Sequence, residues 1–297
     1  MVTTERSLQE IGKSLLVSLP KSWARTLHLK KGSIVKIHVS EQGTLSIAPE
    51  FIEKERPTES SIPFDDHFPR RFLREYFYGR ETITLFSVKT ISLEQKQLLY
   101  LFLKKFMNVQ IIEELSTKIV VKCFKIDELS IEECLKRMHF LSLNMIDNVL
   151  EDNHASLVDL EETATKFYYL LVMQVRRFLD EGKFTKENQI PLIRVLDARM
   201  VAERVKRIIN LCVLISPLEQ KELLALLKEI RHVYQEAFQF FMANAFEKAL
   251  LLYPERDRLL QKYHSFEKKI HSIPLQMQYH RLTRMLTYST EISLLIR

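Results

Sequence analysis

The stretch EIGKSLLVSLPKSWARTLHLKKGSIVKIHV, residues 10–39, decides how the N-terminal part of this 297-residue chain folds. Its side chains alternate between two faces from Leu15 to Leu19, which is typical of a strand, and Pro20 ends that strand. A short basic helix follows, and its apolar face consists of Trp23, Leu27 and Leu29. Gly32 then turns the chain, because glycine takes a positive φ at little cost.

Two further strands complete this N-terminal module. The first covers residues 34–39, and after a tight turn at residues 42–44 the second covers residues 45–48. A module of about fifty residues made of strands and turns buries too little apolar surface to be stable by itself. The sequence therefore predicts that two copies of the chain interleave.

The same stretch resembles the AbrB/SpoVT group of swapped-hairpin DNA-binding domains. The pattern that carries the resemblance is Gly12-x-Ser14-x-x-Val17-x-Leu19-Pro20-Lys21-x-Trp23, followed by Leu27-x-Leu29-x-x-Gly32-x-x-Val35-x-Ile37. The resemblance implies a swapped-hairpin β-barrel over residues 1–50, formed by a homodimer that lays a basic face on double-stranded DNA. In such a dimer we expect Trp23 to be a core anchor rather than a side chain that stacks on bases.

Charge supports a polyanionic partner for this module. The chain has 44 Lys and Arg against 38 Asp and Glu, a formal net charge of +6. Residues 1–50 hold seven of these cations and four acids, so half of the excess (7 − 4 = +3) lies in one sixth of the chain. The candidate DNA-binding residues are Arg6, Lys13, Ser14, Lys21 and Arg25. An ordinary solvated face is the alternative, and the AbrB-like spacing favours DNA.

The next part of the sequence predicts a linker and a small α/β module. Residues 51–63 are polar, charged and flanked by proline, which is typical of a linker. Residues 64–126 then alternate between helical and strand patterns. The expected elements are a helix over 70–78 that ends at Gly79, a strand over 82–88, a helix over 92–107 capped by Ser92, and strands over 109–112 and 118–124.

From residue 127 the pattern is helical, with apolar side chains three and four residues apart. The apolar stripes run over residues 131–149, 157–178, 193–212, 223–245, 259–270 and 275–296, and we expect the fourth helix to continue up to Pro254. Pro217 divides these six helices into two groups of three. The sequence therefore predicts two all-α three-helix bundles, over residues 127–216 and 217–297.

This helical part resembles the PhoU family, whose fold is a pair of three-helix bundles. The order of modules resembles an archaeal-type phosphate uptake regulator with an AbrB-like head, a small α/β insert and a PhoU-like body. The stretches that carry this likeness are Tyr78–Thr84, Gln110–Glu114, Phe167–Leu171 with Arg176, and Arg284–Ile292. The resemblance implies a role in phosphate homeostasis and in the regulation of phosphate transport, with a phosphate transporter or kinase component as a further partner.

PhoU-family bundles carry Glu/Asp-x-x-x-Asp motifs that hold iron or zinc clusters, and this chain departs from that pattern. The carboxylates at the expected places are Glu161, Glu203 and Glu291, and the residues four positions away are Thr165, Arg207 and Thr287. Because the second carboxylate is missing each time, we expect no bound metal. Glu203 and Arg207 are instead spaced as an ion pair on one helix face.

Other features exclude several classes of site. Asp147 and Glu151 have metal-like spacing, but their helical phase places them opposite the apolar stripe, toward solvent. The cysteines Cys123, Cys134 and Cys212 fit neither a zinc site nor a disulfide framework, and we expect buried thiols in a reducing cytosol. No Gly-rich phosphate loop, His-Glu-x-x-His motif or nucleophile elbow is present, so we expect no catalytic residues and no cofactor.

These patterns favour a cytoplasmic, DNA-binding transcriptional regulator that is not an enzyme. No uncharged run reaches the length that spans a membrane, so we expect no membrane insertion. One alternative is an interaction protein that does not bind DNA, in which the helical body docks on a phosphate transporter or sensor kinase and the head serves only as dimeriser. A metal-dependent enzyme is a third hypothesis.

Overall fold

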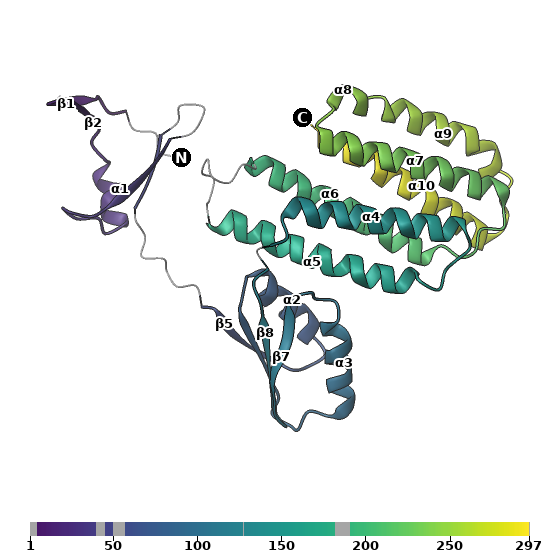
Figure 1. The fold of residues 1–297 in the computed structure, drawn as a ribbon, viewed down its shortest axis with the longest axis horizontal. Helices are drawn as coiled ribbons and strands as arrows, with labels where there is room; N and C mark the ends of the chain where they lie inside the picture. Colours follow the sequence, from purple (N-terminus) through teal and green to yellow (C-terminus); the bar gives the residue numbers. More distant parts are fainter. Residues whose placement is uncertain (1–4, 40–44, 50–56, 127, 182–190, 297) are drawn as a thin grey trace. The chain divides into compact units, whose positions relative to one another are not determined.

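The computed structural model describes residues 5–39, 45–49, 57–126, 128–181 and 191–296 (Figure 1). Its described residues form two compact units, one within residues 1–56 and the other within residues 57–184 and 190–297. Each unit is a separate body with its own secondary structure.

The first unit consists of two short antiparallel strand pairs and one helix. Strands β1 (Gln9–Ile11) and β2 (Ser14–Leu16) form a hairpin, and β3 (Val35–Val39) pairs with β4 (Leu45–Pro49). Helix α1 (Lys21–Thr26) lies between the two strand pairs in the sequence. Gly32 has a φ of 88° in the turn before β3, so the predicted glycine turn is confirmed.

The hairpin differs from the predicted single strand. The side chains of residues 15–19 were expected to alternate between two faces of one strand, but strand pairing ends at Leu16 and a further strand precedes residue 12. Alternation reports which side a residue faces, whereas a strand also needs a partner for its backbone groups. The predicted turn at residues 42–44 lies outside the described residues.

The second unit begins with a four-stranded sheet. Its elements in chain order are β5 (Glu59–Pro63), α2 (Phe68–Phe77), β6 (Thr82–Phe86), α3 (Leu93–Leu103), β7 (Val109–Glu114) and β8 (Lys118–Cys123). The strand order is β5-β6-β8-β7, with β5 parallel to β6 and the other pairs antiparallel. The buried residues of the sheet pack with side chains of α2 and α3 in one apolar cluster.

Sequence signals at the helix ends are confirmed in this sheet module. Ser92 caps α3, since its Oγ accepts from the Gln95 N–H at 3.2 Å while the Gln95 side chain accepts from the Ser92 N–H at 2.9 Å. Gly79 follows α2 with a φ of 75°, which lets the Arg80 N–H reach back to the Glu75 carbonyl at 3.2 Å.

Residues 59–63 correct the prediction of a linker that extends to residue 63. They form β5, paired with β6 from the contact of Glu59 with Thr82 to that of Pro63 with Phe86. Ile62 is the buried side chain of this edge strand. The segment is mostly polar because an edge strand buries few residues, and so its composition is like that of a loop.

The rest of the second unit is helical. The helices are α4 (Ile131–Leu150), α5 (Leu157–Glu181), α6 (Leu192–Leu214), α7 (Lys221–Ala243), α8 (Phe246–Ala249), α9 (Leu252–Glu267) and α10 (Ile273–Ser293). Six of them match the predicted stripes, but the fourth predicted helix does not continue up to Pro254, because α7 ends at Ala243 and the short α8, which was not predicted, follows it. Asn244 follows the last residue of α7 and has a φ of 51°, so the chain turns out of the helix before residue 246.

The helices lie in two groups of three that share one core. Helices α4, α5 and α6 contact one another, and α7 and α10 both contact α9. Contacts of α6 with α10 and of α4 with α7 join the groups, and their buried side chains form a single apolar cluster. The body is thus one continuous helical core rather than two independent bundles. None of the helices that the structure describes is both long enough and apolar enough to cross a membrane.

Candidate nucleic-acid interface

The five candidate DNA-binding residues all have exposed side chains in the first unit. Lys13 and Ser14 lie at the turn between β1 and β2, and Arg6 precedes β1. Lys21 is the first residue of α1 and Arg25 lies one turn later, so both project from the same side of that helix. The candidates thus lie as two pairs, Lys13 with Ser14 and Lys21 with Arg25, and as the single residue Arg6.

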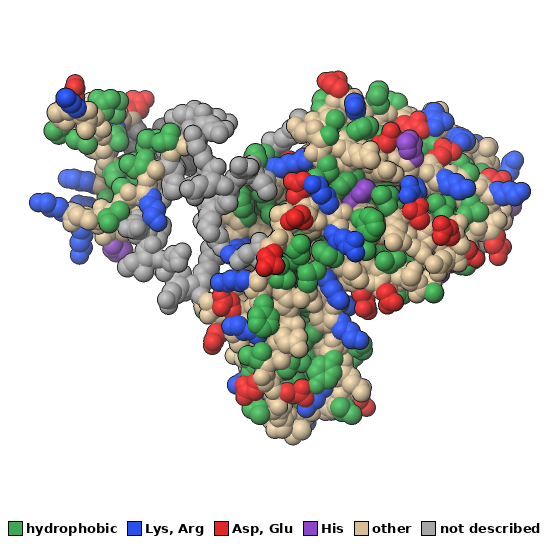
Figure 2. All heavy atoms as spheres, viewed as in Figure 1, with side chains coloured by type: hydrophobic (Ala, Val, Ile, Leu, Met, Phe, Trp, Pro, Cys, Tyr) green, Lys and Arg blue, Asp and Glu red, His purple; other side chains and the backbone are tan. Residues whose placement is uncertain are grey.

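The four candidate cations have no acidic partner. Among residues 5–39 and 45–49, and throughout the rest of the described chain, no carboxylate forms an ion pair with Arg6, Lys13, Lys21 or Arg25. In the second unit, by contrast, ion pairs hold many of the Lys and Arg side chains. Figure 2 shows Lys and Arg side chains that project from the first unit beside apolar ones. Its positive charge is therefore available to an external anion.

Three further exposed cations in this unit, Lys30, Lys31 and Lys36, were not among the candidates. Lys30 and Lys31 lie directly after α1 in the turn that contains Gly32. The Lys30 N–H donates to Ser33 Oγ at 2.9 Å, which orders the backbone here and leaves the ammonium group exposed. The adjacency of Lys30 and Lys31 in sequence was the signal that could have identified these two.

The apolar side chains of the first unit are exposed to an unusual degree. None of its described residues is buried, and Trp23 is only half-buried. The large apolar residues with exposed fractions between 43% and 67% are Leu8, Ile11, Leu15, Leu16, Val17, Ile34, Ile37, Val39 and Leu45. A soluble domain does not keep so many large apolar groups in water, so this surface requires a covering partner.

In the second unit, the three carboxylates that the PhoU resemblance singles out each bind a cation of this chain. The Lys206 ammonium contacts Glu161 Oε1 and lies 2.6 Å from Thr165 Oγ1. Burial opposes ionisation of Glu161, but the ammonium outweighs it and the pKa of the carboxyl is lowered. An amine thus lies where the resemblance would place a metal ion.

Glu203 and Glu291 are neutralised in the same way. Glu203 accepts from Arg199 at 3.3 Å and from Arg207 at 3.2 Å, so the predicted pair with Arg207 is confirmed. Its carboxylate also accepts from the Tyr168 hydroxyl at 2.5 Å. Glu291 pairs with Arg204 at 2.5 Å. These side chains do not fit a metal cluster, because each carboxylate already has a cationic partner.

Of the predicted solvent-facing acid pair, Glu151 is exposed, whereas Asp147 is partly buried against a neighbouring helix. The two Asp147 carboxylate oxygens accept from Arg231 Nε at 2.5 Å and Nη2 at 2.8 Å, and so join α4 to α7. Helical phase shows that a residue lies away from the stripe, but a neighbouring helix can still reach it. Among the described residues, no three His, Cys, Asp or Glu side chains gather closely enough to hold a metal ion.

The predicted buried thiols are confirmed. Cys123, Cys134 and Cys212 are free and buried, and burial raises the pKa of each thiol to about 12. A thiol with such a pKa stays protonated at neutral pH, and this makes these cysteines poor nucleophiles.

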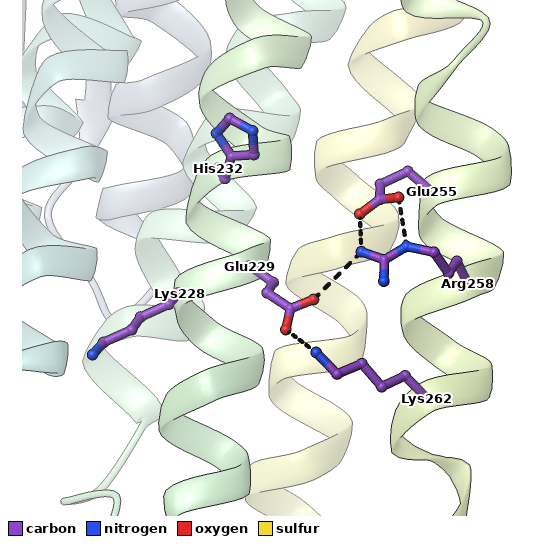
Figure 3. Close-up of a pocket in the computed structure, with 6 residues that line it drawn as sticks. All are labelled: Lys228, Glu229, His232, Glu255, Arg258 and Lys262. Carbon is purple, nitrogen blue, oxygen red and sulfur yellow. Dashed lines mark hydrogen bonds and ion pairs between the residues drawn. The ribbon is translucent and has the colours of Figure 1, made fainter.

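An open pocket of about 360 Å³ lies between α7 and α9 (Figure 3). Both of its carboxylates are already paired, with Arg258 and Lys262. Glu229 contacts Lys262 at 2.5 Å and Arg258 at 3.8 Å, and Arg258 also pairs with Glu255 at 2.5 Å. Figure 3 shows the Lys228 side chain pointing away from these pairs. The pocket is thus a groove bridged by ion pairs, which stabilise the packing of the two helices.

Comparison with known proteins identifies a relative of the first unit only. Residues 8–55 match the family described as "Antidote-toxin recognition MazE, bacterial antitoxin". No curated protein and no solved structure matches the chain. The N-terminal part of the chain therefore carries a MazE/AbrB-like domain, in agreement with the predicted AbrB-like head, and a helical body follows it.

Proposed function

We propose that this protein is a DNA-binding regulator whose first unit contacts duplex DNA as a homodimer. The observation that carries the proposal is a MazE/AbrB-like domain in which Arg6, Lys13, Lys21 and Arg25 are exposed and have no acidic partner among the described residues. In the second unit, by contrast, acidic side chains pair with many of the Lys and Arg side chains, among them Lys206, Arg231 and Lys262.

Dimerisation follows from the exposed apolar surface of the first unit. Side chains such as Leu15, Ile37 and Val39 are each more than half exposed, and a second copy would cover them with the same kind of surface. Strand pairs of three and five residues also leave backbone groups without partners, which a second copy can pair.

The cations would contact the DNA backbone. Lys21 and Arg25 present two positive groups from one side of α1, and Lys13 presents a third from the hairpin turn. The Ser14 hydroxyl can donate to a phosphate oxygen. Each neutralised phosphate releases counterions, so binding becomes weaker as the salt concentration rises.

Charge reversal tests this proposal. We expect the double substitution Lys13→Glu and Arg25→Glu to weaken duplex binding at least about a hundredfold in a mobility-shift assay, because four phosphate contacts per dimer are replaced by repulsion. Lys89→Glu in the second unit is the control, since Lys89 is an exposed lysine outside the proposed interface. If the double variant bound DNA as tightly as the control, the interface would lie elsewhere.

We further infer that the regulated genes concern phosphate uptake. Support comes from the likeness of the module order to PhoU-type regulators and from two groups of three helices in the body. Chromatin co-precipitation in the native host tests the link, with enrichment expected upstream of phosphate-transport genes. Enrichment at other genes alone would refute the phosphate role and leave DNA binding intact.

A second candidate is an antitoxin-like protein that binds a toxin, because the matched family is described by antidote–toxin recognition. In this case, as for a body that docks on a transporter or sensor kinase, the first unit would serve as dimeriser. Function in vivo that survives charge reversal at Lys13 and Arg25 would favour these protein-binding roles over DNA binding.

A further inference from the structure

Four arginines and two acids lie where the side chains of α6 and α10 meet. We call this set the arginine seam. Its cations are Arg204 and Arg207 from α6 and Arg281 and Arg284 from α10, and its acids are Glu203 and Glu291. The seam therefore has a formal charge of +2 (four minus two), which favours an anion.

The guanidinium groups of two helices converge on one phenol within the seam. Arg284 Nη2 donates to Tyr288 Oη at 2.7 Å, and Arg207 Nη1 lies 3.5 Å from the same oxygen. Both guanidinium groups also lie near the Tyr288 ring, at 5.6 Å for Arg207 and 5.7 Å for Arg284 from its centroid. Packing of α6 against α10 thus brings three hydrogen-bond donors to one place.

Two of these three donors, the Arg284 guanidinium and the Tyr288 hydroxyl, can each donate a further hydrogen bond. Arg204 and Arg207 pair with carboxylates, and Arg281 donates to the Leu214 carbonyl at 2.5 Å. Arg284 has no carboxylate partner among the residues that the structure describes, and its side chain is exposed. The Tyr288 oxygen accepts from both arginines, so its own proton is free to be donated.

Electrostatics strengthen the phenol as a donor. Partial burial raises the pKa of Tyr288, but hydrogen bonds from Arg284 and then Arg207 outweigh it and the net pKa is lowered. A hydroxyl with a lowered pKa donates a stronger hydrogen bond to an anion.

We propose that Arg207, Arg284 and Tyr288 form a binding site for a small tetrahedral oxyanion of the phosphate class. Guanidinium groups offer paired N–H donors that match two oxygens of such an anion, and the hydroxyl supplies a donor to a third. A dianion suits the seam better than a single carboxylate does, because the surplus is two charges. The site lies in the second unit and goes beyond the proposed DNA binding by the first.

Calorimetric titration of the full chain tests this site. Inorganic phosphate and a phosphate monoester (adenosine monophosphate) are the two ligand arms, and they distinguish a free anion from a phosphorylated metabolite. Both are compared with chloride at equal ionic strength, and binding in either phosphate arm but not with chloride supports the site. Arg284→Gln and Tyr288→Phe should each weaken binding roughly tenfold or more, since each removes one donor to a charged group.

Arg256→Gln is the matched control. Arg256 also lies over a tyrosine, 5.2 Å from the Tyr253 ring, but it already pairs with Asp257 at 2.8 Å. We expect this variant to bind like the wild-type chain. The site is refuted if neither ligand binds better than chloride, if Tyr288→Phe binds as the wild type does, or if the control loses as much affinity as Arg284→Gln. The assay contains no DNA, so its failure would not bear on the first unit.

Discussion

Single side chains decide which ions the helical body can hold. Glu161 and Lys206 form a half-buried pair that Thr165 completes, and Glu203 is shared by cations one turn before and one turn after it on α6. Removing one member of such a pair would leave the other uncompensated in a poorly solvated place. A metal ion at these carboxylates would first have to displace a cation of the protein.

His139 is the clearest buried titratable group in the helical core. Its ring stacks on Phe238 with centroids 3.7 Å apart, and its Nε2 has no hydrogen-bond partner among the described residues. Burial, and secondarily the positive charge of Arg231, lower its pKa to about 3. The imidazole is therefore neutral in the folded chain at every pH above that value.

This histidine makes stability depend on pH. Below pH 6.5, the ordinary pKa of histidine, His139 is protonated in the unfolded chain but stays neutral in the folded chain. The free energy of unfolding therefore falls as the pH drops from 6.5 toward 3. Between pH 7 and pH 5 the loss is about 2 kcal/mol. We expect His139→Met to remove it, as measured by urea unfolding at both pH values. The exposed His280 is the control: His280→Asn should keep the full loss, and an unchanged loss in His139→Met would contradict this account.

At the scale of elements, local capping explains where α4 begins. Ser130 Oγ accepts from the Glu133 N–H at 3.1 Å, and the Glu133 carboxylate accepts from the Ser130 N–H at 2.8 Å. These two bonds satisfy backbone donors that the first turn of a helix leaves unpaired.

Removal of this cap should destabilise the second unit measurably. We expect Ser130→Ala to lower the free energy of unfolding by about 1 kcal/mol in a urea titration. Ser272 precedes α10 at the equivalent position, but its side chain makes no capping hydrogen bond. Ser272→Ala should therefore cost less than about 0.5 kcal/mol. Equal losses in the two variants would show that the capping bonds of α4 contribute nothing.

Elements with a strong apolar stripe were predictable, and those stabilised by partners elsewhere in the fold were not. The six long helices and strands β6, β7 and β8 repeat their apolar residues at helix or strand spacing. Strand β5 was missed because only Ile62 is buried in it. At the end of α7, Phe238 and Phe241 are buried, whereas Phe246 in α8 is 45% exposed.

At the scale of the whole molecule, sequence predicted the type of head but not the arrangement of its site. Spacing of Gly12, Pro20 and Trp23 identified the domain that the family match supports. The lack of acidic partners for Lys13 and Arg25 could not be predicted, because it depends on which carboxylates approach in space. The ion pairs of Glu161 with Lys206 and of Glu291 with Arg204 could not be predicted for the same reason.

The two units also differ in how they are stabilised. The second has large apolar clusters in which Tyr234, Phe72 and Met145 are fully buried. The first has none among its described residues, and the proposed association with another copy would supply the apolar core that this unit lacks. In the proposed dimer, the exposed cations of both copies would share the surface that this association forms.

The salt dependence and stoichiometry of duplex binding by the full-length chain test the central claim most directly. Fluorescence anisotropy with a labelled duplex should give two chains per bound site. The logarithm of affinity should fall linearly with the logarithm of salt concentration, with a slope of up to about −7 if four cations per chain each neutralise one phosphate. One chain per duplex, or an affinity that salt does not change, would contradict a dimer that presents its unpaired cations to DNA.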